Sequence, residues 1–530
     1  MTISDTHPID ADTLDTAIQR FRAVVGAEHV HTEGPAFDEF RDPFEPRQWN
    51  AYLPSVVVQP DSTEQVQQIV RIAGELDVPL WTNGQGRNNG YGGAAPRVTG
   101  SVLLNLRRFN RILEIDDELA YAVVEPGVSW LELYTALREG GHDLTLSVPD
   151  IGWGSVIGNS LDHGVTYMQY GEDYQAPCGL EVVLADGSLL RTGMGAQEGN
   201  PTWHLYKKGL GPGLDHLFMQ SNFGVVTRMG VWLQRRPEFV LPAHVIGETE
   251  ESIIGMVDVL RELKLDRTIE GVPCIFRGLN AAGMVSRRKD WYSGEGRVPD
   301  ELVDRIGREL GVGQWFLRLG MWGDGPVLDH KYAKVKAAFE AVPGVRVESV
   351  GKLTPAEAEE LEHGSDRVIT GVANLDLARI SNWNGGEGGD TGGHIDFSPV
   401  LPLTGRATWD LIQQVKPIQE AAGFDFSLVV MAISARAALF VCGSKFNWTD
   451  LEETQRAYDT ARTLIVEAGK KGYAAYRAHL DFMDLAAEQL DFGDHAYLRF
   501  AETIKDAVDP QGILSPGKQG IWPRRLREGR

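Results

Sequence analysis

One short segment of the chain is dense enough in glycine to bind phosphate groups. Residues 83–93 read NGQGRNNGYGG and follow the β-rich stretch 78–81. Glycine lets backbone N–H groups converge on phosphate oxygens without obstruction by side chains. The segment has neither the GxGxxG spacing nor the Walker lysine. On its own it is therefore also typical of a tight structural turn.

The pattern around this loop predicts the elements that would position it. Residues 52–59 are β-rich, and Ser62 and Gln65 then form a capping-box pattern that opens a helix. More strands are predicted after the loop, at residues 101–106, 111–115, 119–125, 180–184 and 188–192. Asp186-Gly187 joins the last two as a hairpin turn. The first half therefore mixes helices and strands in one layered α+β domain.

The pattern of predicted elements changes near Arg235-Arg236-Pro237, beyond which the helical segments are longer. We place a domain boundary there, so that residues 1–237 form a first domain and residues 238–472 a second. Longer helices are predicted in the second domain, at residues 251–263, 299–310 and 329–341. Beyond residue 472 a polar helix is predicted to run through Ile504, followed by the turn-rich stretch 509–517.

Composition excludes several classes of function. The 530 residues carry a formal net charge of −23, which opposes binding to nucleic acid. No apolar run approaches the roughly 20 residues that span a bilayer, so we expect no membrane segment. The polar, acidic start has no signal-peptide pattern, and we expect a cytoplasmic protein. Cys178, Cys274 and Cys442 lie far apart, so we expect buried thiols, no disulfide framework and no metal site.

An ordered series of motifs points to one family. The series consists of the glycine loop and the stretches 125–128 (EPGV), 149–159 (PDIGWGSVIGN), 179–184 (GLEVVL), 220–227 (QSNFGVVT) and 509–523. It resembles the vanillyl-alcohol oxidase and 4-cresol methylhydroxylase flavoprotein family, particularly the bacterial eugenol-oxidase or 4-alkylphenol-oxidase type. The resemblance implies a two-lobed, α+β FAD-linked oxidase fold. Residues 1–237, with 473–530 returning to them, would bind FAD, and residues 238–472 would form an α+β cap over the isoalloxazine ring.

The resemblance also implies which residues hold the cofactor. In this family the glycine loop and the segment around Gly154 lie against the pyrophosphate and ribityl chain of FAD. The matching positions are Asn83, Gly84, Gly86, Arg87, Asn88, Asn89, Gly90, Gly154, Ser155, Gly158 and Val226. His394 matches the histidine that binds the flavin 8α carbon covalently, a reaction that needs a neutral, nucleophilic imidazole.

Three residues match the positions that meet at the phenol oxygen of the family's substrates: Tyr91, Tyr476 and Arg477. A phenol has a pKa of about 10, and a fixed guanidinium with two hydroxyl donors favours its anion. The phenolate then pushes electrons toward its para carbon, and the benzylic carbon releases hydride to flavin N5, giving a para-quinone methide. Arg477 can also balance negative charge on the reduced flavin.

Two further residues match the family's pocket. Asp150 corresponds to an acidic residue near flavin N5 that assists flavin attachment and the proton or water step, although it could also be a turn or helix-cap residue after Pro149. Tyr167 corresponds to a pocket tyrosine, although ordinary core packing would explain it too. Val429, Met431 and Ile433 alternate in an apolar stretch, so they either line the side-chain end of the pocket or pack in a core strand.

The chain departs from the family pattern at three places. Phe44 follows Asp42-Pro43 where fungal members have a histidine that helps to activate the linking histidine. Leu377 stands where eugenol-oxidase-like members have a glutamate, and residues 383–390 are unusually rich in glycine.

We therefore predict an FAD-dependent phenol oxidase that acts on 4-alkyl-, 4-allyl- or 4-hydroxymethylphenols. O2 would reoxidise the flavin and give hydrogen peroxide, and a homodimer is expected from the family. The alternatives are a dehydrogenase that passes electrons to a cytochrome, a 2-hydroxy-acid oxidase with the same fold, and a non-catalytic flavin- or aromatic-binding protein. The sequence does not specify the preferred para substituent or the ratio of alcohol to alkene product.

Overall fold

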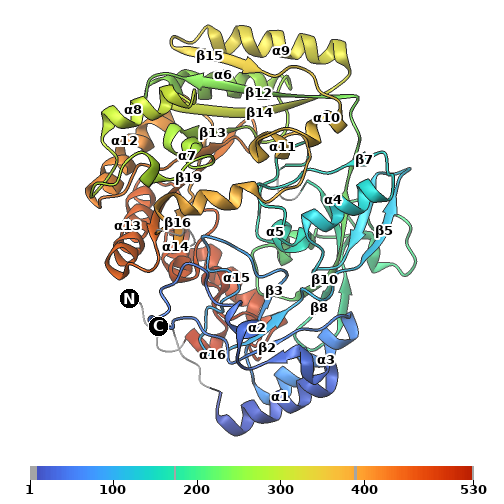
Figure 1. Cartoon of the computed structure of the whole chain (residues 1–530). Helices are drawn as coiled ribbons and strands as arrows, with labels where there is room; N and C mark the ends of the chain where they lie inside the picture. Colours follow the sequence, from blue (N-terminus) through green and yellow to red (C-terminus); the bar gives the residue numbers. More distant parts are fainter. Residues whose placement is uncertain (1–8, 172–174, 387–390, 528–530) are drawn as a thin grey trace.

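A computed structural model describes residues 9–171, 175–386 and 391–527 of the chain. It consists of two lobes, each built from helices and sheets (Figure 1). The lower lobe in Figure 1 contains the blue and cyan first half together with the red C-terminal helices, and the upper lobe contains the green to orange segments. The predicted two-domain α+β fold is thereby confirmed.

The lower lobe begins with a four-stranded sheet in the order β1-β2-β4-β3. Its strands are β1 (Val30–His31), β2 (Val56–Val58), β4 (Val102–Asn105) and β3 (Leu80–Asn83). Strands β2 and β3 both run parallel to β4. Helix α3 (Thr63–Leu76) connects β2 to β3, which allows these two strands to run in the same direction. Ser62 caps this helix by accepting a hydrogen bond from the Gln65 N–H, as predicted. The Gln65 side chain accepts from the Asp61 N–H, so the reciprocal half of the predicted capping box is not formed with Ser62. Helices α1 (Ala11–Val25) and α3 bury their apolar faces against this sheet.

A second sheet in the lower lobe is antiparallel and five-stranded, in the order β5-β6-β10-β8-β9. Its strands are β5 (Ile112–Asp116), β6 (Tyr121–Val124), β10 (Val225–Trp232), β8 (Pro177–Val183) and β9 (Leu189–Arg191). The predicted hairpin at Asp186-Gly187 joins β8 and β9. Helix α4 (Trp130–Glu139), which opens with a complete capping box, and the short helix α5 (Val156–Leu161) pack beside this sheet (Figure 1). Two short strands, β7 (Leu144–Thr145) and β11 (Gln234–Arg235), pair nearby.

An eight-stranded antiparallel sheet forms the centre of the upper lobe. Seven strands follow one another in the order β15-β12-β14-β13-β18-β19-β16, and β17 (Val400–Pro402) also pairs with β19. The seven strands are β15 (Val345–Ser349), β12 (Phe239–Gly247), β14 (Trp315–Gly323), β13 (Cys274–Arg277), β18 (Val429–Met431), β19 (Ala437–Asn447) and β16 (Gly392–Phe397). All of these strands lie between residues 239 and 447. The division of the chain at residue 237 stays a prediction.

The two faces of this sheet have different partners, because successive side chains of a strand point to opposite sides. Leu317, Val430 and Phe440 lie on the face that packs against the upper helices. These helices are α6 (Ser252–Leu265), α9 (Gly325–Glu340), α12 (Gly405–Ala421) and α13 (Leu451–Gly469). Phe276 and Met431 lie on the other face and belong to a core shared with lower-lobe residues. This second face is the one directed toward the lower lobe.

The C-terminal segment returns to the lower lobe. Leu80 at the start of β3 donates from its N–H to the Ile513 carbonyl at 2.7 Å, and its own carbonyl accepts from the Ser515 N–H at 2.7 Å. Lys505 and Asp509, both without solvent exposure, form an ion pair of 2.7 Å that fixes this return. Residues 513–515 therefore extend the four-stranded sheet at its β3 edge.

One sequence prediction in this region is wrong in detail. The single polar helix predicted through Ile504 is instead α14 (Met483–Glu488) followed by α15 (Phe492–Val508). Gly493, Asp494 and His495 all have φ near +60°, a left-handed conformation that interrupts a right-handed helix. The chain therefore bends at the start of α15.

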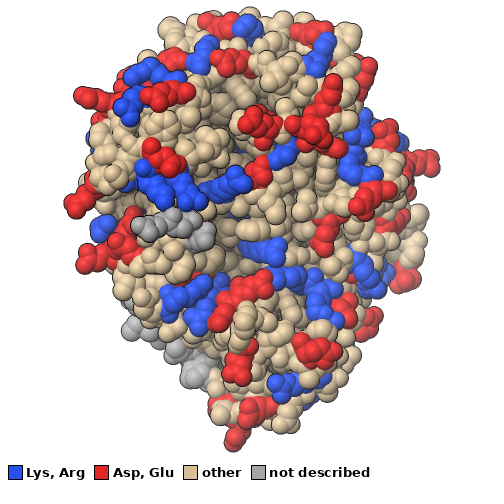
Figure 2. Space-filling view, viewed as in Figure 1, with Lys and Arg blue, Asp and Glu red and all other residues tan. Residues whose placement is uncertain are grey.

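Surface charge and hydropathy agree with the composition. Acidic and basic side chains are interspersed over the face shown in Figure 2, so the excess negative charge is not concentrated there. Among the described helices none is both long and apolar enough to cross a membrane. All three cysteines are buried and free, as predicted.

Candidate active site

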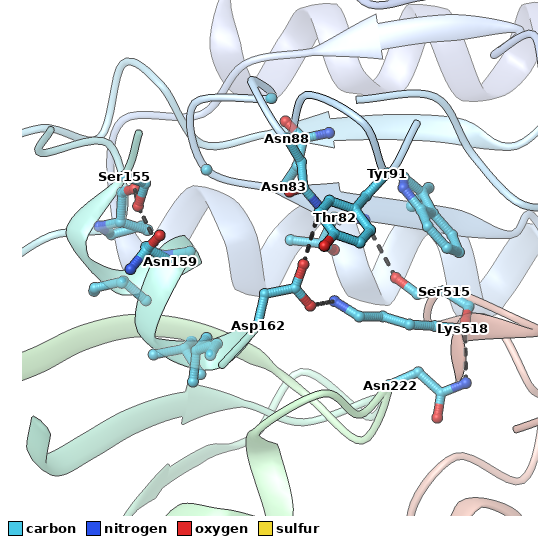
Figure 3. A pocket seen from close by; sticks show the side chains of 18 of the residues that line it. Thr82, Asn83, Asn88, Tyr91, Ser155, Asn159, Asp162, Asn222, Ser515 and Lys518 are labelled. Carbon is cyan, nitrogen blue, oxygen red and sulfur yellow. Dashed lines mark hydrogen bonds and ion pairs between the residues drawn. The ribbon is translucent and has the colours of Figure 1, made fainter. Parts of the chain in front are cut away.

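A cleft opens between the glycine loop, the start of α5, the start of β10 and the C-terminal segment (Figure 3). Eleven of the predicted site residues line it: Asn83, Gly84, Gly86, Arg87, Asn88, Tyr91, Gly154, Ser155, Gly158, Val226 and Arg477. The other predicted site residues are not among the lining residues: Asn89, Gly90, Asp150, Tyr167, His394 and Tyr476. The cleft thus joins four segments that lie far apart in the sequence.

Two glycines along this cleft have different roles. A Cβ atom on Gly84 would lie 2.8 Å from both the Pro126 carbonyl oxygen and the Ser155 side chain. The close approach of these segments therefore requires glycine. Gly154 differs, because a Cβ there would meet no protein atom within 4 Å. Since Gly154 lines the cleft, its missing side chain leaves room for a ligand to approach the backbone.

Several polar atoms of the cleft lack a partner within the described protein. The buried Oγ1 of Thr82, Oγ of Ser221 and Oδ1 of Asn222 accept or donate no hydrogen bond among the described residues. A buried polar atom without a partner is costly, and such atoms usually meet a ligand or water. The cleft therefore offers hydrogen-bonding groups to a long, polar ligand.

Asp162 links the two walls of the cleft (Figure 3). Its carboxylate accepts a hydrogen bond from Asn88 at 3.1 Å and lies 3.5 Å from the Lys518 ammonium. Burial opposes ionisation of Asp162, but Lys518 and Arg477 hold its pKa below the ordinary value. This carboxylate therefore stays charged and ties the glycine loop to the C-terminal segment.

Tyr91 and Arg477 line the cleft, and Tyr476 lies beside Arg477 although it is not itself a lining residue. The guanidinium carbon of Arg477 lies 3.9 Å from the centroid of the Tyr91 ring and 5.6 Å from that of Tyr476. Burial raises the pKa of both tyrosines, so both hydroxyl groups stay protonated donors. The Nε of Arg477 has no hydrogen-bond partner among the described residues. The three side chains together present a cation and two O–H groups.

Ser398 holds this group in place. Its hydroxyl lies 3.1 Å from the Tyr91 hydroxyl, and its carbonyl accepts from the Tyr476 N–H at 3.0 Å. Gln220 fixes the other side of the same backbone by donating to the Tyr476 carbonyl at 2.8 Å. Because Ser398 follows β16 directly, the position of the two tyrosines is tied to the strand that carries His394.

His394 lies on the face of β16 that is directed toward the glycine loop. Its Nδ1 is 3.0 Å from the Ser381 hydroxyl, and its Nε2 is 3.5 Å from an Asp396 carboxylate oxygen. A Cβ on Gly90 would approach this Nε2 to 2.6 Å, so the glycine loop passes directly over the imidazole. Burial lowers the pKa of His394, which keeps the ring neutral. Phe44 packs against it with ring centroids 5.0 Å apart.

Asp150 and Tyr167 form a separate polar cluster at the interface of the lobes. The Tyr167 hydroxyl donates to Oδ2 of Asp150, and Oδ1 of Asp150 accepts from Arg318, which has no solvent exposure. The Arg318 guanidinium also stacks on the Tyr167 ring at 4.3 Å. Tyr167 is thus more than a core-packing residue.

The apolar residues of β18 alternate between the two faces of the sheet: Val430 packs against the upper helices, whereas Val429 and Met431 lie on the face directed toward the lower lobe. Val429 and its cross-strand partner Val441 are partly exposed on the sheet face directed toward the lower lobe, in the cluster that includes Tyr476. Met431, and Ile433 just after the strand, belong to the same cluster. Leu377, which stands where eugenol-oxidase-like members have a glutamate, is buried, with 5% of its surface exposed. The predicted alternation is therefore observed, with Val429 and Ile433 the more accessible members.

Comparison with known proteins fits this arrangement. A family model described as an FAD binding domain matches residues 54–193. The 4-cresol dehydrogenase (hydroxylating) flavoprotein subunit of Pseudomonas putida is 35% identical over 510 residues, which cover 95% of each chain. The chain belongs to the vanillyl-alcohol oxidase and 4-cresol methylhydroxylase flavoprotein family.

Two solved structures share the whole architecture. The 4-ethylphenol oxidase from Gulosibacter chungangensis, in an isoeugenol complex, superposes with a TM-score of 0.92 at 36% identity and covers 99% of this chain and 100% of that one. A p-cresol methylhydroxylase with substrate bound gives a TM-score of 0.91 at 33% identity, with coverages of 98% and 99%. The chain is therefore an FAD-dependent oxidoreductase, and the predicted cofactor is confirmed.

Several residues of the site escaped the sequence analysis. Asn222 and Lys518 lie within the motif stretches 220–227 and 509–523 but were not singled out, and Asp162 lies outside every stretch of the series. Their contacts with other segments appear only in the fold. Arg318 did leave a signal, since it is a single charge in the apolar run of β14. Such a charge in a buried strand needs a partner, but only the fold shows that the partner is Asp150.

Proposed function

We propose that this enzyme oxidises para-substituted phenols at the benzylic carbon, with Tyr91, Tyr476 and Arg477 binding the phenolate oxygen. The observation that carries the proposal is the position of the Arg477 guanidinium over both tyrosine rings, with an unpartnered Nε. A cation and two fixed O–H donors stabilise an oxyanion most where water is excluded. The two similar structures are of a 4-ethylphenol oxidase and a p-cresol methylhydroxylase, and these para-substituted phenols support the proposal.

FAD, when bound, supplies the hydride acceptor at N5. The residues of the chain have three tasks in this proposal. Arg477 and the tyrosines favour the phenolate, which raises electron density at the para carbon and leads to a para-quinone methide after hydride loss. Val429 and Ile433 surround the para substituent with apolar surface, which suits alkyl and allyl groups. Asp150 accepts or donates the proton of the following step.

His394 is proposed to bind FAD covalently through Nε2. A neutral imidazole is the nucleophilic form, and burial keeps His394 in that form. Ser381 fixes the orientation of the ring from Nδ1, which leaves Nε2 directed toward the glycine loop. Acid denaturation tests the assignment, because covalently bound flavin leaves its yellow colour with the precipitated polypeptide.

O2 is proposed as the electron acceptor, with hydrogen peroxide as the second product. The histidine at position 394 supports this choice, because family members coupled to a cytochrome attach their flavin through a tyrosine elsewhere. The competing function is that of the Pseudomonas putida relative, whose name describes a dehydrogenase flavoprotein subunit. In stopped-flow experiments the phenol-reduced enzyme should regain its oxidised spectrum within seconds in air. A spectrum that stayed bleached for minutes would assign it to the dehydrogenase group.

The experiment that tests the function is anaerobic reduction with 4-ethylphenol. The flavin absorption should bleach with 4-ethylphenol and persist with glycolate or lactate. Bleaching by the hydroxy acids alone would instead indicate a 2-hydroxy-acid oxidase. No bleaching by any of these compounds, despite bound flavin, would indicate a non-catalytic flavoprotein.

A further inference from the structure

Arg318 is the one charged side chain of β14 that is buried completely, and nothing in the phenolate or cofactor sites uses it. It has no solvent exposure, and within the described chain its only carboxylate partner within 4 Å is Asp150. One N–H donates to Oδ1 of Asp150, and another donates to the Ser365 hydroxyl at 3.0 Å. The guanidinium is sandwiched by Tyr167 at 4.3 Å and Phe276 at 5.0 Å from the ring centroids.

The fold fixes Arg318 from several directions. It lies on the sheet face directed toward the lower lobe, where its cross-strand neighbours are His244 on β12 and Cys274 on β13. His244 is itself paired with Asp366 at 2.7 Å, and Cys274 is a buried thiol with a pKa raised to about 12 by burial. Neither of them can neutralise Arg318. Of the residues that the structure describes, only Asp150 supplies its counter-charge.

The contacts of Asp150 divide between its two oxygens. Oδ1 accepts from Arg318 and Oδ2 accepts from the Tyr167 hydroxyl. Burial and the neighbouring carboxylate raise the pKa of Tyr167 well above its ordinary value, so this phenol remains a donor. Two donors from two lobes thus set the plane of the carboxylate and leave one lone pair on each oxygen available.

We propose that Arg318 is a positioning residue for the reaction, which acts by pairing with the Asp150 carboxylate and orienting it as a proton acceptor. This inference rests on the proposed phenol oxidation. In the step concerned, the oxygen of a water molecule bonds to the benzylic carbon of the para-quinone methide. The exocyclic C=C electron pair returns to the ring and restores the phenolate. The proton released by the water passes to the Asp150 carboxylate, so that no oxidant or reductant is needed.

The geometry distinguishes this role from a purely structural ion pair. A buried guanidinium that served only to join the lobes could pair with any carboxylate, whereas this one pairs with Asp150, for which the family resemblance implies a position near flavin N5. Losing Asp150 leaves the Arg318 charge buried and unpaired. Losing Arg318 leaves the partly exposed Asp150 with only the Tyr167 hydroxyl to orient it. The effects of the two residues on the reaction should therefore be coupled and not additive.

The test is a double-mutant cycle with Arg318→Met, Asp150→Asn and the double variant, each purified with FAD. Anaerobic stopped-flow with 4-ethylphenol measures two rates, bleaching of the flavin and decay of the quinone methide absorbance. We expect each of the two rates in Arg318→Met to lie within about threefold of the same rate in Asp150→Asn. In both variants the slower of the two phases should be about 100-fold slower than in the wild type, which is the scale of general acid–base catalysis. The double variant should be no slower than Asp150→Asn, and Arg318→Lys should recover part of the loss because it keeps the charge.

A matched control separates folding from positioning. Arg277 is also buried, lies on the same sheet and pairs with Glu250 at 2.6 Å, but it does not contact Asp150. Arg277→Met should lower the melting temperature as Arg318→Met does, with both rates unchanged. The double variant removes both charges of the Arg318–Asp150 pair, so it remains measurable if Arg318→Met folds poorly.

Three results would overturn the inference: additive slowing in the double variant, normal rates in Arg318→Met where Asp150→Asn is slow, or normal rates in Asp150→Asn. A wild-type flavin that phenol does not bleach would instead refute the proposed function itself. The two failures are therefore distinguishable in one set of experiments.

Discussion

Arg477 stacks on Tyr91, with the guanidinium carbon 3.9 Å from the ring centroid. This contact brings a side chain from the C-terminal segment onto one from the glycine loop, 386 positions earlier in the numbering of the same chain. The stack leaves the guanidinium edge free to meet an anion, since Nε has no partner among the described residues. The relationship explains why both segments are needed to complete the proposed oxyanion site.

Replacing Arg477 by Met should lower kcat/KM for 4-ethylphenol by at least about 100-fold, the effect of losing one oxyanion donor. The remaining activity should increase with pH toward the phenol pKa of about 10, because the substrate must then ionise without help. Arg477→Lys should lose less. The exposed Arg436 provides the control, and Arg436→Met should leave both the rate and its pH profile unchanged. A pH profile of Arg477→Met that paralleled the wild type would contradict phenolate binding here.

Flavin attachment should respond to Phe44. In this structure its ring packs on His394, at the position where fungal family members have an activating histidine. Phe44→His should therefore shorten the time needed for added FAD to become resistant to acid extraction from the apoprotein. Phe44→Leu, which removes the ring without adding an imidazole, serves as the control and should give no acceleration. His394→Ala should release all of its flavin in acid, and retained colour would refute the assignment.

How far the sequence predicts the site depends on how local each signal is. The glycine loop, the Ser62 cap and the Asp186-Gly187 turn were predicted correctly because each depends on a few neighbouring residues. The Arg318–Asp150 pair could not be predicted, since its members are on different lobes: the lone charge in the apolar run of β14 indicates that Arg318 needs a partner, but not which one. The bend in α15 was missed for another reason: only Gly493 of its three left-handed residues is a usual helix breaker.

The pair Val429 and Val441 should control the size of the para substituent. They face each other across β18 and β19 and are both partly exposed toward the lower lobe. Val441→Phe should lower kcat/KM for 4-propylphenol relative to 4-methylphenol by about 10- to 100-fold, as expected when a pocket loses room for one or two methylene groups. Val400→Phe, at a more exposed position on β17, should not change the ratio. An unchanged ratio in Val441→Phe would place the substituent elsewhere.

Lys505 should be essential for both stability and FAD retention. Its ammonium donates to Asp509, to the Asn222 carbonyl at 2.7 Å and to the Leu514 carbonyl at 2.6 Å. Lys505→Met leaves Asp509 buried without a counter-charge, which costs about 3–5 kcal/mol. Because Asn222 lines the cleft, noncovalent FAD binding to the apoprotein should weaken as well. Thermal unfolding and FAD titration measure the two effects, with the exposed Lys471→Met as control.

Glu45 should make stability depend on pH. Its side chain is 4% exposed, and burial followed by repulsion from Asp42 raises its pKa to about 8. The folded state thus binds a proton that the unfolded state has already lost above about pH 4.5. The resulting stabilisation is complete below that value and is lost as pH rises through 8, by up to about 1.4 kcal/mol per pH unit.

Glu45→Gln removes this titration while keeping an oxygen that can accept from the Ala51 N–H, as the carboxylate now does at 2.8 Å. The melting temperatures of variant and wild type should therefore agree near pH 5, and the variant should be several degrees more stable near pH 8. Glu139→Gln, which changes an exposed carboxylate, should show no such divergence. A difference between Glu45→Gln and wild type that stayed constant from pH 5 to pH 8 would mean that Glu45 is already ionised in the folded protein.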